Sequence, residues 1–172
     1  MTTEFLVQIG ATVIALATAI ASFIAAQAAK SAATQTRRAT QAQLVSTLLD
    51  SYASPEMLDA MISLRTWVGK NGTLHADEFR RLRRDDYDLV RGVDLARRRV
   101  SHFFQKIDAL HTLGFLDEPT VRAVATRGQV AFFREVVEPL EAAITVSYDR
   151  TSFDRLGALY GIGPTLPPMA SP

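Results

Sequence analysis

The chain has 172 residues, a formal net charge of +1 and no cysteine. A nearly neutral chain lacks the overall basic character that favours binding to nucleic acid phosphates. Without cysteine it cannot form thiolate zinc sites, iron–sulfur clusters or cysteine nucleophiles, and nothing calls for an oxidising compartment. The part that follows the N-terminal apolar run is long enough for one domain with a core of its own.

The N-terminal run Phe5–Ala29 is 25 residues long, carries no charge and is bounded by Glu4 and Lys30. An α-helix of that length rises about 37 Å, which exceeds a hydrocarbon thickness of about 30 Å. The run therefore predicts a transmembrane anchor over residues 1–30. Two alternatives stay open. A cleaved signal peptide would have a basic start and a shorter apolar core, and a soluble Ala-rich helix would seldom extend this far without a charge.

The charges beside this run predict its orientation. No Lys or Arg precedes it, whereas Lys30, Arg37 and Arg38 follow it closely. Under the positive-inside rule the N-terminus lies outside and the body lies in the cytoplasm, at the inner membrane of a bacterial cell. A face of small residues permits close contact with another membrane helix, although such faces are also common in Ala-rich chains. The predicted helix-contact residues are Gly10, Ala11, Ala15, Ala17, Ala21 and Ala25.

Residues 31–53 contain neither Gly nor Pro, so we expect the anchor helix to continue through them as a helical stalk. Leu44, Leu48 and Tyr52 repeat every four residues and give the stalk an apolar stripe for packing. Ser54 and Pro55 then provide an N-cap and a first-turn proline for a new helix. The apolar face of that helix consists of Met57, Leu58, Met61, Ile62 and Val68.

The remaining sequence predicts helices only. The longest spans roughly 86–113, where apolar residues recur in three- and four-residue steps, and Gly114 stops it. Asp117 caps the next helix, and a further helix over roughly 129–147 contains Pro139, which predicts a kink or break at 136–138. A short helix over 152–160 comes last. The predicted fold class is all-α, with the anchor and stalk leading into a cytosolic helical bundle over 54–160 and a flexible tail over 161–172.

The segment 102–140 carries a resemblance to a known family. The aromatic pair Phe103 and Phe104 and the turn residues Gly114, Leu116 and Asp117 match its pattern. With the uncharged N-terminal helix, the segment resembles a bacterial family of small single-pass membrane proteins, a domain of unknown function. Members of that family often have Glu after the aromatic pair, where this chain has Gln105. The resemblance implies an anchored, all-helical cytosolic module and supplies no activity.

Arginine is concentrated in one segment. Eight fall within twenty residues, at Arg80, Arg81, Arg83, Arg84, Arg91, Arg97, Arg98 and Arg99. Such a cluster can serve as a patch for anionic lipid headgroups, an acidic partner or nucleic acid phosphates. Acidic residues interleave with it at helical spacing, which favours solvated ion pairs within a helix instead. The candidate partner or lipid surface comprises Arg80, Arg81, Arg83 and Arg84.

Two pairs of adjacent phenylalanines, Phe103–Phe104 and Phe132–Phe133, place one ring on a buried seam and the other about 100° away. The rings of Phe104 and Phe132 therefore either pack between helices or mark a partner surface. The three histidines lack the spacing of a metal site. We expect His111 to form a hydrogen bond near the C-terminus of its helix.

No glycine-rich phosphate loop, nucleophile elbow or metalloprotease motif is present, so we predict no enzyme, no catalytic residue, no metal and no cofactor. We predict a membrane-anchored accessory or scaffolding subunit that binds a larger inner-membrane protein complex. Its predicted partners are the lipid bilayer and an integral membrane protein complex or a second copy of the chain, with no nucleic acid and no small-molecule substrate. The alternative is a membrane-tethered sensor or regulatory module that signals through the anchor–stalk helix.

Overall fold

The computed structural model describes residues 3–145 and 148–163, and in the first helix it describes the side chains of Thr18 and of Ala21 onwards. This described part contains α-helices, one 3-10 turn, one π-helical turn and no strand, which confirms the all-α class. Contacts divide the chain into two compact units, Met1–Leu44 and Val45–Pro172.

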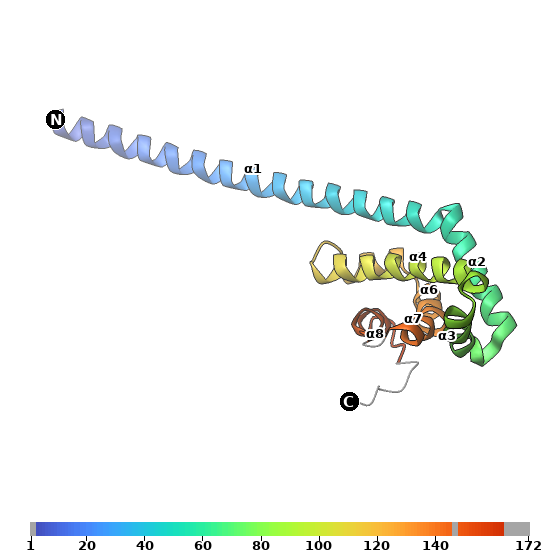
Figure 1. The fold of residues 1–172 in the computed structure, drawn as a ribbon. Helices are drawn as coiled ribbons and strands as arrows, with labels where there is room; N and C mark the ends of the chain where they lie inside the picture. Colours follow the sequence, from blue (N-terminus) through green and yellow to red (C-terminus); the bar gives the residue numbers. More distant parts are fainter. Residues whose placement is uncertain (1–2, 146–147, 164–172) are drawn as a thin grey trace. The chain divides into compact units, whose positions relative to one another are not determined.

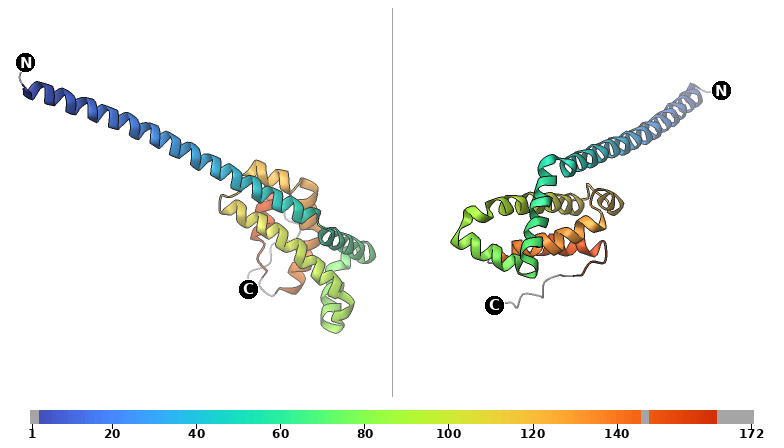
Figure 2. Two further views of the ribbon diagram at one scale, coloured as in Figure 1. Left: turned by 90° about the horizontal axis from the view of Figure 1, so that it is seen from above. Right: turned by 90° about the vertical axis from the view of Figure 1, so that its right-hand side faces the viewer.

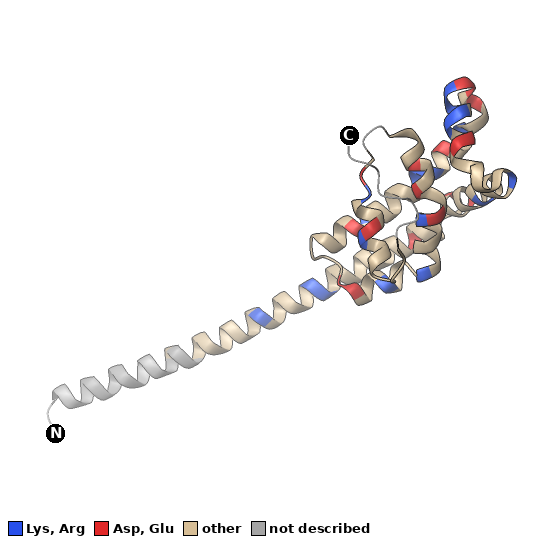
Figure 3. Ribbon diagram, turned by 90° about the horizontal axis from the view of Figure 1, so that it is seen from below, with Lys and Arg blue, Asp and Glu red and all other residues tan. Residues whose placement is uncertain are grey.

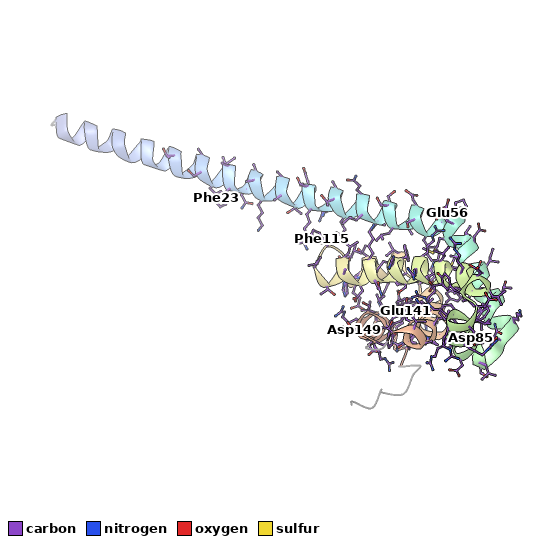
Figure 4. All side chains as sticks on the ribbon, viewed as in Figure 1. Phe23, Glu56, Asp85, Phe115, Glu141 and Asp149 are labelled. Atoms are coloured by element: carbon purple, nitrogen blue, oxygen red, sulfur yellow. The ribbon has the colours of Figure 1, made fainter. Side chains whose placement is uncertain are left out.

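The first unit consists of the N-terminal part of α1, a helix that runs unbroken from Thr3 to Ala53 (Figure 1). Every residue from 21 to 40 is exposed. Phe23 and Ile24 have exposed fractions of 65% and 62%, and Figure 4 shows Phe23 projecting from the helix. Among the side chains described here, the charges of this unit are all positive and come from Lys30, Arg37 and Arg38 (Figure 3).

Within the described residues, no helix combines the length and the hydropathy that crossing a membrane requires. Much of the predicted anchor, including Gly10, Ala11, Ala15 and Ala17, lies outside the residues whose side chains are described. The two other predicted contact residues, Ala21 and Ala25, are described and exposed. The anchor and its helix-contact face therefore stay predictions.

The second unit begins with the last turns of α1 and continues with α2 (Pro55–Asn71), the 3-10 turn Gly72–Leu74, α3 (His75–Asp85) and α4 (Tyr87–Thr112). Shorter elements follow: α5 (Glu118–Val124), α6 (Arg127–Phe132), the π-helical turn Phe133–Val137, α7 (Glu138–Ile144) and α8 (Thr151–Ala158). The central element is α4, which packs against α2, α3, α8 and the π-helical turn. Figure 2 shows it running beside the orange and red elements α6 to α8.

Local sequence signals set the helix ends as predicted. The hydroxyl of Ser54 accepts a hydrogen bond from the backbone N–H of Met57 at 3.2 Å and so caps α2. The carboxylate of Asp117 caps α5 in the same way, from the N–H of Thr120 at 3.0 Å. Gly114 has a φ of +74°, a left-handed conformation that costs glycine little, and it follows the end of α4.

The predicted interruption near Pro139 is confirmed and takes the form of a π-helical turn. Pro139 has no backbone N–H, so it cannot donate to the carbonyl four residues earlier. The N–H of Glu138 bonds instead to the carbonyl of Phe133, five residues earlier, which widens the turn. The predicted single helix is thereby divided into α6, the π-helical turn and α7.

A continuous series of aromatic rings runs through the core of the second unit. Tyr52, Phe103, Phe104, Phe133 and Phe153 follow one another with ring centroids 5.3, 5.2, 4.5 and 4.0 Å apart. Burying such rings supplies much of the hydrophobic stabilisation of a small domain. The series joins the end of α1, α4, the π-helical turn and α8. Because Phe104 is only 1% exposed, its interpretation as a partner surface is wrong, and it is a core residue.

Candidate interaction surface

The arginines of α3 are mostly paired with acids of the same helix. Arg81 donates to Glu78 at 2.9 Å, and Arg84 donates to Asp85 at 2.9 Å. The hydrogen bond from Arg81 lowers the pKa of Glu78, and the hydrogen bond from Arg84 lowers the pKa of Asp85. Basic and acidic segments accordingly alternate along this helix in Figure 3. For these residues the structure favours solvated ion pairs over an unpaired basic patch.

The other two predicted surface arginines are also engaged or partly covered. Arg80 lies 3.7 Å from Asp77, and its Nε donates to the backbone carbonyl of Ala143 at 2.9 Å. That second bond ties α3 to the end of α7. Arg83 is half-buried. The four predicted arginines therefore do not form one free cationic surface.

Further along the segment, Arg97 is buried rather than solvated. Its exposed fraction is 4%, and its Nε and Nη2 donate to Oδ1 of the fully buried Asp94 at 3.1 and 2.8 Å. It also forms an ion pair with Glu141, which links α4 to α7. Asp94 receives further contacts from Arg98 at 3.0 Å and from the hydroxyl of Tyr87 at 3.1 Å. Burial works to raise the pKa of Asp94, but the hydrogen bonds and charges of Arg97 and its neighbours prevail and lower it.

A second buried group of charges connects the π-helical turn, α7 and α8. Arg134 is 1% exposed; it donates to the carbonyl of Phe153 and, at 3.2 Å, to Asp154. Glu138 is fully buried and lies 3.8 Å from Arg134 and 3.1 Å from Arg150. Burial raises the pKa of Glu138 even though the two arginines act to lower it. The pairing offsets part of the cost of burying these charges.

A hollow of about 1100 Å³ opens beside this group. Charges of both signs line it: Arg134, Arg150 and Arg155 are basic, and Asp149 and Asp154 are acidic. Tyr148 also lines it, and burial together with the nearby Glu138 carboxylate raises the pKa of that phenol. A phenol held in its neutral form does not act as a base, and each of the three arginines is already paired with an acid. The hollow therefore gives no basis for assigning a substrate.

The third buried acid, Asp108, completes the links between α4 and α8. It accepts a hydrogen bond from Arg155 at 2.8 Å and one from the hydroxyl of Ser152 at 2.9 Å. Its exposed fraction is 2%. The groups around Asp94 and Asp108 thus join α4 to helices far along the sequence, the group around Glu138 joins consecutive elements, and all three act to hold the bundle together.

An exposed apolar strip on α2 is the feature most suited to binding another protein. Leu58 and Ile62 are one helical turn apart and are 47% and 60% exposed. They belong to the predicted apolar face of α2, of which Met57 and Met61 are buried whereas Leu58 and Ile62 stay exposed. The predicted apolar face was broader than the surface α4 can cover. Sequence periodicity could not show which edge of it stays exposed.

The strip continues onto a cation and an aromatic ring. Arg65 follows Ile62 on the same face of α2, and its guanidinium lies 5.3 Å from the ring centre of Phe132 in α6. Phe132 is half-buried, so this predicted partner residue lies beside the exposed strip. We call Leu58, Ile62, Arg65 and Phe132 the α2 strip. Apolar, aromatic and arginine side chains are the types enriched where proteins bind one another.

The histidines have structural positions. Nδ1 of His111 lies 2.9 Å from the carbonyl oxygen of Leu116 and donates to it near the end of α4, which confirms the prediction for this residue. His75 is buried, and its Nδ1 lies 3.0 Å from the carbonyl of Gly72. Among the side chains that the structure describes, no three from His, Asp or Glu gather in a way that would hold a metal ion.

Comparison of the chain with family models, with curated proteins and with solved structures found no match. The resemblance of segment 102–140 to the bacterial single-pass family therefore remains a prediction.

Proposed function

We propose that this chain is a membrane-anchored binding protein without catalysis of its own, an accessory or scaffolding subunit that docks on a larger inner-membrane protein complex. The observation that carries the proposal is the uncharged run Phe5–Ala29, which lies in one unbroken helix and is followed by three cations. A helix with this composition needs a lipid or protein environment, because helices are only marginally stable in water on their own and gain most of their stability from packing.

The orientation belongs to the same proposal. Under the positive-inside rule, Lys30, Arg37 and Arg38 favour an N-terminus outside and a bundle in the cytoplasm. The predicted small-residue face from Gly10 to Ala25 would contact helices of the partner complex within the bilayer. The α2 strip would supply the contact outside the bilayer, since its apolar side chains are already exposed.

The anchor is tested by a charge placed in the run. We expect Ala17→Glu to release the chain from membranes washed at alkaline pH, because a carboxylate near the bilayer centre costs about 3 kcal/mol. The matched control is Ala42→Glu, an exposed position on the same helix beyond the three cations. The measurement is the fraction of each variant that stays in the membrane pellet. Equal retention of both variants would contradict a spanning anchor.

The binding function is tested by isolating the tagged chain from its native membranes in mild detergent and identifying co-purified proteins by mass spectrometry. A stoichiometric larger complex would support an accessory subunit. Digestion of the bundle by protease added to right-side-out vesicles would contradict the orientation. Recovery of the chain alone, as a monomer or as a homo-oligomer, would contradict docking on a larger complex.

A second candidate function is a sensor or regulatory module that signals along α1. The observation that favours it is that the last turns of α1 pack against the bundle through Leu48 and Tyr52. Leu48 is 1% exposed, and the hydroxyl of Tyr52 lies 3.2 Å from the sulfur of Met61 while its ring contacts Phe103. The same helix that contains the predicted anchor thus ends against the core. A displacement of α1 would therefore change its contacts with α2 and α4.

A further inference from the structure

A groove lies within the second unit where the end of α1, the start of α2 and the middle of α4 meet. It has a volume of about 600 Å³ and is lined by Ser51, Ser54, Glu56, Met57, Arg99, His102, Phe103 and Lys106. Glu56, one of these residues, is labelled in Figure 4 at the start of α2. The groove is separate from the α2 strip and from the hollow beside α8.

Three potential cations line one side of this groove. Arg99, His102 and Lys106 are spaced at three and then four residues, so they project from one face of α4. All three are exposed, and none forms a salt bridge with a carboxylate in the described part of the chain. This distinguishes them from the arginines of α3, whose charges are largely neutralised by acids on their own helix.

The opposite side of the groove is the beginning of α2. Nη1 of Arg99 donates to the backbone carbonyl of Glu56 at 2.9 Å, which holds the guanidinium across the groove. The first turn of α2 adds the partial positive charge of a helix N-terminus. Met57 and Phe103 are 2% and 4% exposed and give the groove an apolar floor.

One carboxylate also lines the groove. Hydrogen bonds from its own backbone and from Ser54, with a smaller effect of Arg99, lower the pKa of Glu56, so it is ionised at neutral pH. Two basic side chains, Arg99 and Lys106, therefore face one carboxylate, and the imidazole of His102 adds a further donor. The balance is positive, with donors arranged above an apolar floor.

We propose that this groove binds the phosphate group of a phosphate ester. Arg99 and Lys106 contact the phosphate oxygens, and His102 donates a further hydrogen bond. An anionic phospholipid headgroup and a soluble phosphate ester share this chemistry. The site adds a ligand to the chain and does not depend on the proposed membrane function.

The test uses the full chain in micelles of a neutral detergent at fixed ionic strength. Two probes are titrated separately: glycerol 3-phosphate, and short-chain phosphatidylglycerol mixed into the micelles. The readout is the imidazole NMR signal of His102, assigned by comparison with His102→Gln. We expect saturable binding of at least one probe. If only one probe saturates, it shows whether the phosphate group belongs to a lipid or to a soluble ester.

Variants of the groove residues make the test specific. Lys106→Gln should weaken binding about tenfold, because it removes one charge-assisted contact. Glu56→Gln should tighten binding, since it removes the opposing carboxylate while its amide oxygen can still accept the hydrogen bonds from its own backbone and from Ser54. The matched control, Arg91→Gln, removes an exposed cation of α4 outside the groove and should change affinity less than twofold.

Tighter binding by Glu56→Gln cannot result from misfolding, so this variant protects the test from that artefact. A lack of saturable response to both probes would overturn the proposal. So would equal weakening by Lys106→Gln and Arg91→Gln, because that would indicate general attraction of anions rather than a site. Failure of Glu56→Gln to tighten binding would place the phosphate elsewhere.

Discussion

At the residue scale, the guanidinium of Arg134 occupies space that a side chain on α8 would need. Arg134 passes against Gly157 to reach the carbonyl of Phe153 and the carboxylate of Asp154. A methyl group on Gly157 would overlap the guanidinium and lie 2.8 Å from the carbonyl oxygen of Ile162. Gly157 is therefore required for close approach and not for an unusual backbone conformation, since its φ is not positive.

We expect Gly157→Ala to lower the free energy of unfolding by about 1–3 kcal/mol, the usual cost of overpacking a buried site. The matched control is Gly92→Ala in α4, where nothing lies within 4 Å of the added carbon. Because alanine favours a helix over glycine, that control should gain about 1 kcal/mol. Urea denaturation of both variants measures the difference. A gain in stability for Gly157→Ala would show that Arg134 does not pack against α8.

At the element scale, the buried pair Asp94–Arg97 and its contact with Glu141 hold α4 against α7. We expect Asp94→Asn to lower the free energy of unfolding at pH 7 by about 3 kcal/mol, because buried Arg97 loses one of its two carboxylate partners. Asp85→Asn, which removes an exposed acid paired with Arg84, is the control and should change little.

The pH dependence of this variant has a definite sign. The pKa of Asp94 in the folded chain lies below its ordinary value of 3.8, so folding favours the ionised carboxylate. The contribution of the Asp94 carboxylate to the free energy of unfolding is complete above pH 3.8. It is lost as the pH falls through the lower, folded-state pKa. The difference in free energy of unfolding between wild type and Asp94→Asn should therefore become smaller below pH 3.8. A difference that stays constant from pH 7 to pH 2 would contradict the role of the charge.

Sequence patterns predicted the helices better than the contacts between them. Caps at Ser54 and Asp117 and the break near Pro139 depend on neighbouring residues, so they are visible in the sequence. The burial of Arg97 is not visible in the sequence, because an arginine three residues after an aspartate forms the same pair on an exposed helix face as in a core. The contact with Glu141, which is distant in the sequence, is what shows that the pair lies in the core. The groove was missed for the same reason, since its residues come from three helices.

At the scale of the whole molecule, α1 belongs to two units: residues 1–44 and, from Val45, the bundle. Trp67 is the only tryptophan and is buried in the second unit, so its fluorescence reports on the unfolding of the bundle alone. We expect Ala32→Pro, at an exposed position of the first unit, to reduce the helical circular dichroism signal and leave the Tm reported by Trp67 unchanged.

The comparison variant on the same helix is Leu48→Ala. Leu48 is 1% exposed and belongs to the second unit, so its truncation should lower the free energy of unfolding by about 2–5 kcal/mol and lower the Tm reported by Trp67. Both variants are measured in the same neutral detergent. If Ala32→Pro lowered that Tm as much as Leu48→Ala, the two units would unfold as one body. That result would favour the sensor function, because a signal can pass along α1 only if a change in residues 1–44 alters the bundle.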